Sequence, residues 1–343
     1  KKMKNIIFLI DAQKGASGGG KVIYQYSNYI NSFKGYSSSI AHVKKKKIGK
    51  LFDSINKKFN RKFKQVEYSG WKFKDLKIKK NHFFSWFNIN IKIKNNLIFN
   101  KEEDFVILPE MFAHFAAEFF IKKNIPYAIF VQNGYSIFPT NNKAKLNLAY
   151  KKSKFIMSYS KDIKECISLA YPREKNKIID VKYSIDFKKF KKVKKKNTIT
   201  YMPRKLRRHS ELVISFLKNY LPKKWKIKPL INLTENEVYK NLAESKIFLA
   251  FSELEGLPLP PVEAAISGNK VIGYTGEGGK EYWKKPIFTE IKSSEIKKFC
   301  KSILSNLNSK NFLQNSHKQR KKLSNMFSKK AEHNAIKKFL KKI

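Results

Sequence analysis

Two glutamates bracket a turn rich in glycine and proline in the second half of the chain. Glu255 and Glu263 enclose the sequence Gly-Leu-Pro-Leu-Pro-Pro-Val, and the apolar run 247–251 precedes them. That run predicts a buried strand, while the prolines and Gly268 suit the first turn and the end of a helix. Glu255 then lies at the strand exit and Glu263 in the first helical turn. Both carboxylates can face one cleft and accept hydrogen bonds there.

The backbone of this turn is a second source of chemistry. N–H groups of residues 256–260 would point at whatever lies over the strand ends, which forms an anion site of the helix N-terminus type. A structural role stays open, because two glutamates at this separation also occur by chance. Glu263 would then only complement the helix dipole.

The elements that position this turn form two series of alternating strands and helices. The first series opens with an apolar strand at 5–10, a glycine loop and a helix, which is the opening unit of a Rossmann-like domain. Alternation of this kind predicts a parallel α/β sheet. The later elements of the first series are strands at 105–108, 127–131 and 155–158 and helices at 112–123 and 160–169; the second series has strands at 198–202, 246–250 and 270–274 and a helix at 210–220.

A change in composition separates the two series. The lysine-rich stretch 188–196 is the best linker candidate. We therefore predict an α/β protein with two Rossmann-like domains, 1–187 and 188–330, followed by a final amphipathic helix at 331–343.

The segment from Glu255 to Ala264 resembles the E-x7-E signature of retaining glycosyltransferases of the glycosyl transferases group 1 type, also called family 4. Other landmarks of that family have counterparts in the same order, and the resemblance covers most of the chain. It implies the GT-B fold, in which two Rossmann-like domains face each other across a cleft. The counterparts are its glycine loop at 18–20, its interdomain segment at 184–186, its donor-phosphate segment at 201–205 and a later turn at 275–279.

The resemblance assigns roles in the second domain. Glu255 would hold the donor sugar hydroxyls beside the reacting carbon, and Glu263 would accept hydrogen bonds from the ribose hydroxyls. Arg204 would neutralise the diphosphate leaving group. Backbone groups would line the sugar and the diphosphate at Gly256, Leu257, Pro258 and Leu259.

The family usually has a lysine six residues after its arginine, but Ser210 occupies that position here. The second cation must then be Lys205, Arg207 or Arg208, and a solvated loop is the alternative for the two arginines.

The resemblance also assigns roles in the first domain. Gly19 and Gly20 would approach the phosphates, because no side chain blocks them. His114 follows a strand end and is a candidate catalytic contact to the sugar, with a helix-surface histidine as the alternative. The turn 132–135 is a further candidate contact to donor or acceptor, and a plain turn is equally compatible.

The resemblance predicts transfer of a sugar with retention of anomeric configuration. The co-substrate would be a nucleotide-diphosphate-sugar, and the acceptor an unidentified glycan or lipid-linked sugar, with polysaccharide biosynthesis as the setting. The chain has no Asp-x-Asp motif and no cluster with metal-ligand spacing, so we expect neither a catalytic metal nor another cofactor. Another GT-B enzyme, a phosphorylase or a nucleotide-sugar epimerase, is the alternative, since fold does not fix reaction.

Composition sets the remaining expectations. A net charge of +48 would suit nucleic acid or an anionic membrane, but lysine accompanies asparagine, isoleucine and phenylalanine throughout, as in an AT-rich coding sequence. A basic nucleic-acid-binding protein is the competing class. It leaves residues 252–268 unexplained, so we expect no nucleic-acid partner.

Cys166 and Cys300 form no motif, and no apolar run approaches the length needed to span a membrane. We expect a cytoplasmic protein, with peripheral contact to an anionic membrane as an option.

Overall fold

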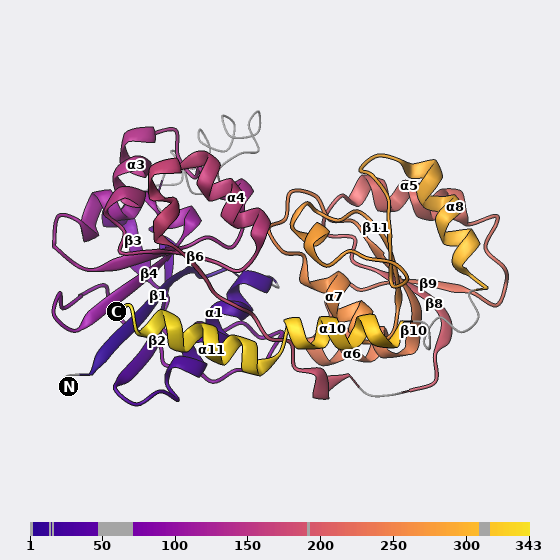
Figure 1. The fold of residues 1–343 in the computed structure, drawn as a ribbon, viewed down its shortest axis with the longest axis horizontal. Helices are drawn as coiled ribbons and strands as arrows, with labels where there is room; N and C mark the ends of the chain where they lie inside the picture. Colours follow the sequence, from indigo (N-terminus) through magenta and orange to yellow (C-terminus); the bar gives the residue numbers. More distant parts are fainter. Residues whose placement is uncertain (1–2, 14, 16, 47–70, 191–192, 309–315) are drawn as a thin grey trace. The chain divides into compact units, whose positions relative to one another are not determined.

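The computed structural model describes residues 3–13, 15, 17–46, 71–190, 193–308 and 316–343. They form two compact units (Figure 1). Unit 1 comprises Lys1–Tyr159, Ile163–Val181 and Lys338–Ile343, and unit 2 comprises Ser160–Asp162 and Lys182–Lys337. Apart from Ser160–Asp162, unit 2 begins at Lys182, whereas the boundary was predicted after residue 187. Residues 191 and 192 of the predicted linker lie outside the described residues.

Unit 1 is built on a seven-stranded sheet in the order β3-β2-β1-β4-β5-β6-β7. All its pairings are parallel except that of β2 with β3. The direction of the strand order reverses between β1 and β4, which makes their carboxyl ends a topological switch point. The strands are β1 Lys4–Asp11, β2 Tyr36–Lys45, β3 Leu76–Ile78, β4 Asp104–Pro109, β5 Tyr127–Phe130, β6 Ile156–Ser158 and β7 Ile178–Asp180.

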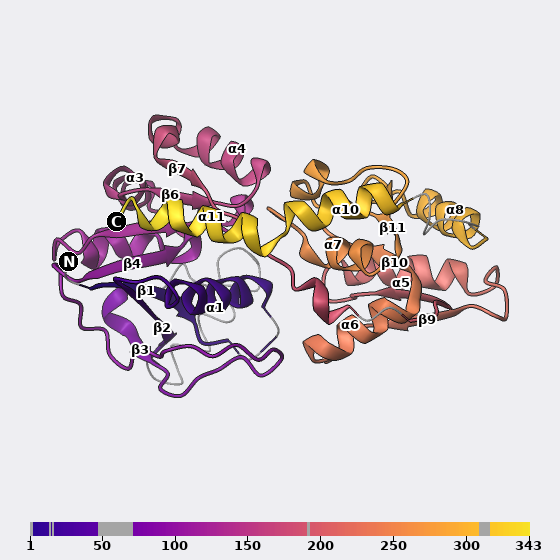
Figure 2. The same ribbon diagram turned by 60° about the horizontal axis from the view of Figure 1, so that its bottom comes forward.

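Helices cover the sheet of unit 1 (Figure 2). Helix α1, Gly18–Ile30, follows the glycine loop as predicted, and Ser17 caps it by accepting the N–H of Gly20. The helix predicted at 112–123 is wrong as a regular α-helix, because the segment divides into a 3-10 turn, Glu110–Phe112, and a π-helical turn, Ala116–Phe120. The other helices are α3 Lys143–Lys152 and α4 Lys161–Ala170.

Unit 2 is built on a five-stranded parallel sheet in the order β12-β11-β10-β8-β9. Its switch point lies between β8 and β10, because the chain adds β9 on one side of β8 and the later strands on the other. The strands are β8 Lys196–Tyr201, β9 Lys226–Pro229, β10 Ser245–Ala250, β11 Lys270–Gly273 and β12 Phe288–Glu290. The helices are α5 Arg207–Leu217, α6 Glu235–Glu244, α7 Leu259–Ile266, α8 Ile296–Asn306, α10 His317–Met326 and α11 Lys329–Leu340.

The last helix, α11, belongs to both units, since the boundary falls after Lys337. Its predicted apolar face is confirmed, because Ala335, Ile336 and Phe339 are buried. Phe339 packs edge-on against Phe155 of unit 1 with ring centroids 5.5 Å apart. The predicted final helix is thus present as α11, and its last residues, from Lys338 on, belong to unit 1.

Candidate functional site

The switch point of unit 2 brings two predicted site residues together. β8 and β10 are neighbouring parallel strands, so the segments after them leave the sheet at the same edge. The Lys205 ammonium lies 2.7 Å from the Glu255 carboxylate, and their side chains are 45% and 17% exposed. A cation and a carboxylate thus meet where open α/β sheets bind their ligands.

The loop after β11 fixes the backbone of Glu255. The N–H of Glu255 donates to the carbonyl of Gly276 at 2.8 Å, and the N–H of Gly278 donates to the carbonyl of Glu255 at 3.0 Å. A Cβ on Gly278 would stand 1.9 Å from the carbonyl oxygen of Gly256. Only glycine permits this approach, so the turn predicted at 275–279 holds Glu255 in place.

Backbone strain is present in the loops around this pair. Three residues there have positive φ angles: 47° at Leu206, 48° at Leu254 and 69° at Glu277. They lie in the loops that follow β8, β10 and β11. Such conformations cost on the order of 1–3 kcal/mol each for residues other than glycine, and they concentrate at functional sites. The strain supports a functional reading of this edge.

Two hydroxyl groups orient the peptide planes of the turn between the glutamates. Ser160 donates to the carbonyl of Gly256 at 2.6 Å, and Tyr282 donates to the carbonyl of Pro258 at 2.5 Å. In a trans peptide the C=O and the N–H of one plane point in opposite directions. The N–H groups of Leu257 and Leu259 therefore point away from Ser160 and Tyr282, as an anion site requires.

Helix α7 begins as the prolines predict. Pro258 is its N-cap and no side chain caps it, while Gly268 follows its end with a φ of 88°. The N–H groups of Gly256 and Leu257 have no hydrogen-bond acceptor within the described part of the chain. These donors are available to a ligand.

Glu263 belongs to a network that the sequence analysis missed. The Tyr239 hydroxyl lies 3.2 Å from a Glu263 oxygen and 3.1 Å from a Glu235 oxygen. Lys189 pairs with the other Glu235 oxygen at 2.5 Å, and Phe190 packs on the Tyr239 ring. A phenol has one proton, so it cannot satisfy both carboxylates fully. Lys189 offsets the charge of the buried Glu235.

One sequence signal marks part of this network. Thr234 and Glu237 form a capping box at the start of α6. Glu235 and Tyr239 are four residues apart after that start, so they share one helix face. Nothing in the E-x7-E motif points to that face.

The remaining predicted cations occupy different settings. Arg204 and Arg208 are exposed in the loop after β8 and at the start of α5. Arg207 pairs with Glu211 on the surface of α5 at 2.8 Å, so its charge is engaged there. Ser210 is buried and donates to the carbonyl of Arg207. Among the alternatives for the second cation, Lys205 is the one that contacts a predicted site glutamate.

In unit 1, the glycine loop lies beside the end of β5. Gln132 donates from its amide to the carbonyl of Gly19 at 3.1 Å. A Cβ on Gly19 would meet the Gln132 amide oxygen at 2.6 Å, and one on Gly20 would meet the Phe84 ring at 2.8 Å. An added Cβ would thus displace the flexible end of Gln132 at one position and the Phe84 ring at the other. The predicted approach of both glycines to phosphates stays a prediction.

Glu110 is a buried carboxyl group at the same edge, which the sequence analysis did not single out. It follows β4 and accepts the backbone N–H groups of Gln132 at 3.0 Å and Asn133 at 3.1 Å. Its side chain is 2% exposed, and burial raises its pKa to about 7 despite these hydrogen bonds. Glu110 therefore ties the ends of β4 and β5 together and can exchange a proton near neutral pH.

His114 is buried, so the helix-surface alternative is wrong. Its exposure is 2%, and its Nε2 lies 3.1 Å from the carbonyl of Trp71. A carbonyl only accepts, so Nε2 carries the proton and Nδ1 is an acceptor, with no partner among the described residues. Burial lowers the pKa of His114. The ring is suited to a neutral ligand, and its contact with a sugar stays a prediction.

Two searches of the described residues gave negative results. No group of three or more His, Cys, Asp or Glu side chains there is arranged to hold a metal ion. No helix in that part of the chain is long and apolar enough to cross a membrane.

Sequence comparison gives a narrow match. No protein-family profile matches the chain. ORF330 of Acidianus filamentous virus 2, to which glycosyltransferase activity is assigned by name only, is 38% identical over 56 residues. The match covers 16% of this chain and 17% of that protein, so the chain spans about a sixth of the relative's length.

Structural comparison covers nearly the whole chain. TarM from S. aureus, solved with fondaparinux, alpha-GlcNAc-glycerol and UDP, is 11% identical, with a TM-score of 0.64 and 99% of both chains covered. HepE from Anabaena, solved with UDP-glucose, is 10% identical, with a TM-score of 0.65, covering 99% of this chain and 100% of its own. Both are glycosyltransferases of the GT-B fold. The chain therefore has the GT-B fold, which confirms the predicted fold class.

Proposed function

We propose that the protein is a glycosyltransferase that moves a sugar from a nucleoside-diphosphate sugar to an acceptor, with retention of anomeric configuration. The observation that carries the proposal is the Lys205–Glu255 pair at the switch point of unit 2. It lies next to the backbone N–H groups that Ser160 and Tyr282 orient. Cation, carboxylate and oriented donors on one turn suit a diphosphate that carries a sugar.

Binding of the donor divides among these groups by charge. Lys205 and Arg204 neutralise the diphosphate, and the N–H groups of Leu257 and Leu259 donate to its oxygens. Glu263 accepts from the ribose hydroxyls and Glu255 from the sugar hydroxyls. TarM and HepE were solved with UDP and UDP-glucose, which makes uridine diphosphate sugars the first donors to test.

Retention needs no carboxylate on the far side of the sugar. The acceptor hydroxyl attacks the anomeric carbon on the side that the diphosphate leaves. The bond from that carbon to the diphosphate oxygen breaks, and the diphosphate takes the acceptor proton. The leaving charge grows on the diphosphate, where Lys205 and Arg204 stabilise it without a metal ion.

The acceptor we propose is a glycan or a lipid-linked sugar. The TarM structure holds two hydroxyl-rich compounds besides UDP, fondaparinux and alpha-GlcNAc-glycerol. The neutral polar groups of unit 1, His114 and Gln132 among them, suit hydroxyl groups more than charged ones. A peripheral position at an anionic membrane would bring a lipid-linked acceptor within reach.

Transfer can be tested directly with a panel of UDP-sugars and oligosaccharide acceptors, with and without chelator. NMR of the product anomer reports the stereochemistry. We expect a product with the donor's configuration, formed equally well in chelator. An inverted product would contradict retention, and loss of nucleotide binding in chelator would contradict the metal-free mechanism. Conversion of the donor with no second molecule glycosylated would favour an epimerase.

A further inference from the structure

A cavity in unit 1 plays no part in the site described above. Its volume is about 560 Å³, within the range of roughly 300–1,000 Å³ that small-molecule sites occupy. The 3-10 turn Phe73–Asp75, the π-helical turn Ala116–Phe120 and helix α3 contribute to its walls. All three belong to unit 1, so the described lining comes from one folded body.

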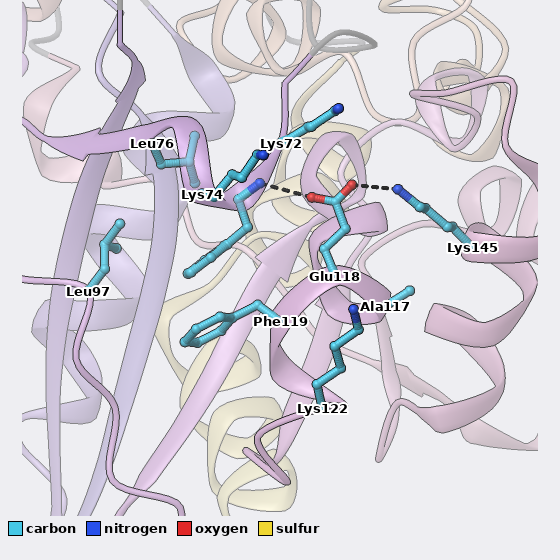
Figure 3. Close-up of a pocket in the computed structure, with 10 residues that line it drawn as sticks. Lys72, Lys74, Leu76, Leu97, Ala117, Glu118, Phe119, Lys122 and Lys145 are labelled. Carbon is cyan, nitrogen blue, oxygen red and sulfur yellow. Dashed lines mark hydrogen bonds and ion pairs between the residues drawn. The ribbon is translucent and has the colours of Figure 1, made fainter.

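One side of the cavity is cationic. Lys72, Lys74, Lys122 and Lys145 surround a single carboxylate, Glu118 (Figure 3). Glu118 accepts from Lys145 at 2.8 Å and from the N–H of Phe73 at 2.9 Å. Among the described residues no carboxylate pairs with the other three ammonium groups. A concave surface lined by one sign of charge concentrates ligands of the opposite sign.

The other side is apolar. Phe73 and Phe119 stack with ring centroids 4.0 Å apart, and Leu76 and Leu97 lie beside them (Figure 3). Phe119 and Leu97 remain partly exposed to solvent. Covering such surface contributes about 25 cal/mol per Å². A purely ionic ligand would leave this contribution unused.

We infer that the cavity binds an amphiphilic phosphate ester. Its phosphate lies among Lys72, Lys74 and Lys122, and its hydrocarbon chain covers Phe119 and Leu97. A phosphate monoester carries about −1.5 to −2 charges at neutral pH and three acceptor oxygens, so it can meet several ammonium groups at once. A carboxylate has fewer acceptor oxygens than a phosphate monoester. Lysine ammonium groups are compact charges that commonly bind phosphate.

Glu118 makes the cavity a formed site before the ligand arrives. It holds Lys145 on one wall and the backbone of Phe73 on the other. Fixing both walls lowers the ordering cost of binding. The inference does not depend on the proposed transfer reaction, because no residue of the donor site contributes to the cavity.

Calorimetric titration with hexyl phosphate, inorganic phosphate and hexanol tests the two sides separately. We expect hexyl phosphate to bind at least about 10-fold more tightly than either of the others, because only it reaches both sides. The combined substitutions Lys72→Ala, Lys74→Ala and Lys122→Ala should lower the affinity for hexyl phosphate by about 10-fold or more. Phe119→Ala should lower the affinity for hexyl phosphate and leave the affinity for inorganic phosphate unchanged.

A control with the same loss of charge separates a site from general attraction. Lys151, Lys152 and Lys175 are exposed lysines of unit 1 outside the cavity lining. Their combined replacement by alanine should change hexyl phosphate binding by less than about 2-fold, since exposed charges are screened beyond about 10 Å. Equal losses in the two triple variants would overturn the inference, as would equal affinities for hexyl phosphate and inorganic phosphate.

Vesicles distinguish the two sources of such a phosphate. Phosphatidylcholine vesicles that contain phosphatidic acid present it in a bilayer, and vesicles of phosphatidylcholine alone are the control. Hexyl phosphate presents it as a free molecule. Selective loss of phosphatidic acid binding in the cavity variant identifies a bilayer source. Binding of hexyl phosphate alone identifies a free amphiphile, and binding of neither overturns the inference.

Discussion

The two units present contrasting chemistry at the carboxyl ends of their strands. In unit 1 the polar groups are buried, since Glu110 and His114 are each 2% exposed. In unit 2 the Lys205–Glu255 pair remains accessible, with 45% and 17% of its side chains exposed. Burial favours the uncharged form of both groups in unit 1. One sheet edge therefore buries its titratable groups where the uncharged forms are favoured, and the other exposes a charged pair.

The contrast shows how one kind of scaffold can supply two kinds of binding surface. Both edges follow parallel strands at a switch point, so topology alone does not set them apart. The difference comes from the depth at which the titratable groups are placed and from the partners they meet. Substitutions at each edge test this difference.

Glu255→Gln should have the largest effect. It keeps the size of the side chain and removes the charge that pairs with Lys205. We expect turnover to fall about 100- to 1,000-fold, with donor affinity affected far less, as for an interaction made mainly in the transition state. Steady-state kinetics measure the turnover, and calorimetry measures the donor affinity. Glu253→Gln is the matched control on an exposed residue of the same loop, and a fully active Glu255→Gln enzyme would remove Glu255 from catalysis.

Glu110→Gln should change how stability depends on pH. The native carboxyl has a pKa of about 7 against an ordinary 4.5. Between these values the native state holds a proton that the unfolded state has lost, so the group makes stability fall as pH rises through this window. Glutamine cannot titrate, so the wild type should lose about 2–3 kcal/mol relative to the variant between pH 4.5 and 7. Urea midpoints measured across that range check this, and parallel profiles would contradict it.

Glu263→Ala should weaken nucleotide binding by roughly 1–3 kcal/mol, because the ribose hydroxyls lose their acceptor. Titration with UDP and 2′-deoxy-UDP makes the test specific. The wild type should prefer UDP, and the variant should bind both alike. Glu263 is the fifth residue of α7, whose first turn holds no acidic residue, so the dipole role predicted for it is wrong. If the variant keeps its full affinity for UDP, Glu263 does not bind the ribose.

Tyr239→Phe should have the smallest effect. It removes the hydroxyl that lies between Glu235 and Glu263 and keeps the ring that packs on Phe190. We expect UDP affinity to fall by about 0.5–1.5 kcal/mol together with the preference over 2′-deoxy-UDP. Tyr220→Phe on the exposed surface is the control. An unchanged preference would show that Tyr239 does not position Glu263.

Sequence reasoning succeeded where the causes are local. Proline and glycine fixed the bounds of α7, and apolar runs located the central strands of both sheets. It missed β9, because two of its four residues, Lys226–Pro229, are lysines and three of the four are exposed. It also missed Ser160, which lies 96 positions before the carbonyl it binds. No local pattern encodes such a contact, and the same holds for Tyr239 and Glu263.

In the segment after β4, the sequence predicted a regular helix that the structure does not form. Its apolar periodicity favoured one helix over 112–123, but aromatic packing overrode it. Phe73 stacks on Phe119 and packs edge-on against Phe120, with centroids 4.0 and 5.3 Å away. The backbone there adopts a π-helical turn. Tertiary contacts made by large rings can outweigh the propensity of a short helix.

The division of α11 between the units has a mechanical consequence. Apart from Ser160–Asp162, unit 2 runs from Lys182 to Lys337, and unit 1 occupies the chain on both sides of it. Tension applied between β1 and the end of α11 is therefore carried by unit 1 alone for as long as that unit stays folded. The sheet that positions Glu255 and Glu263 lies outside the segment under tension. Unit 1 must therefore unfold before the force acts on unit 2.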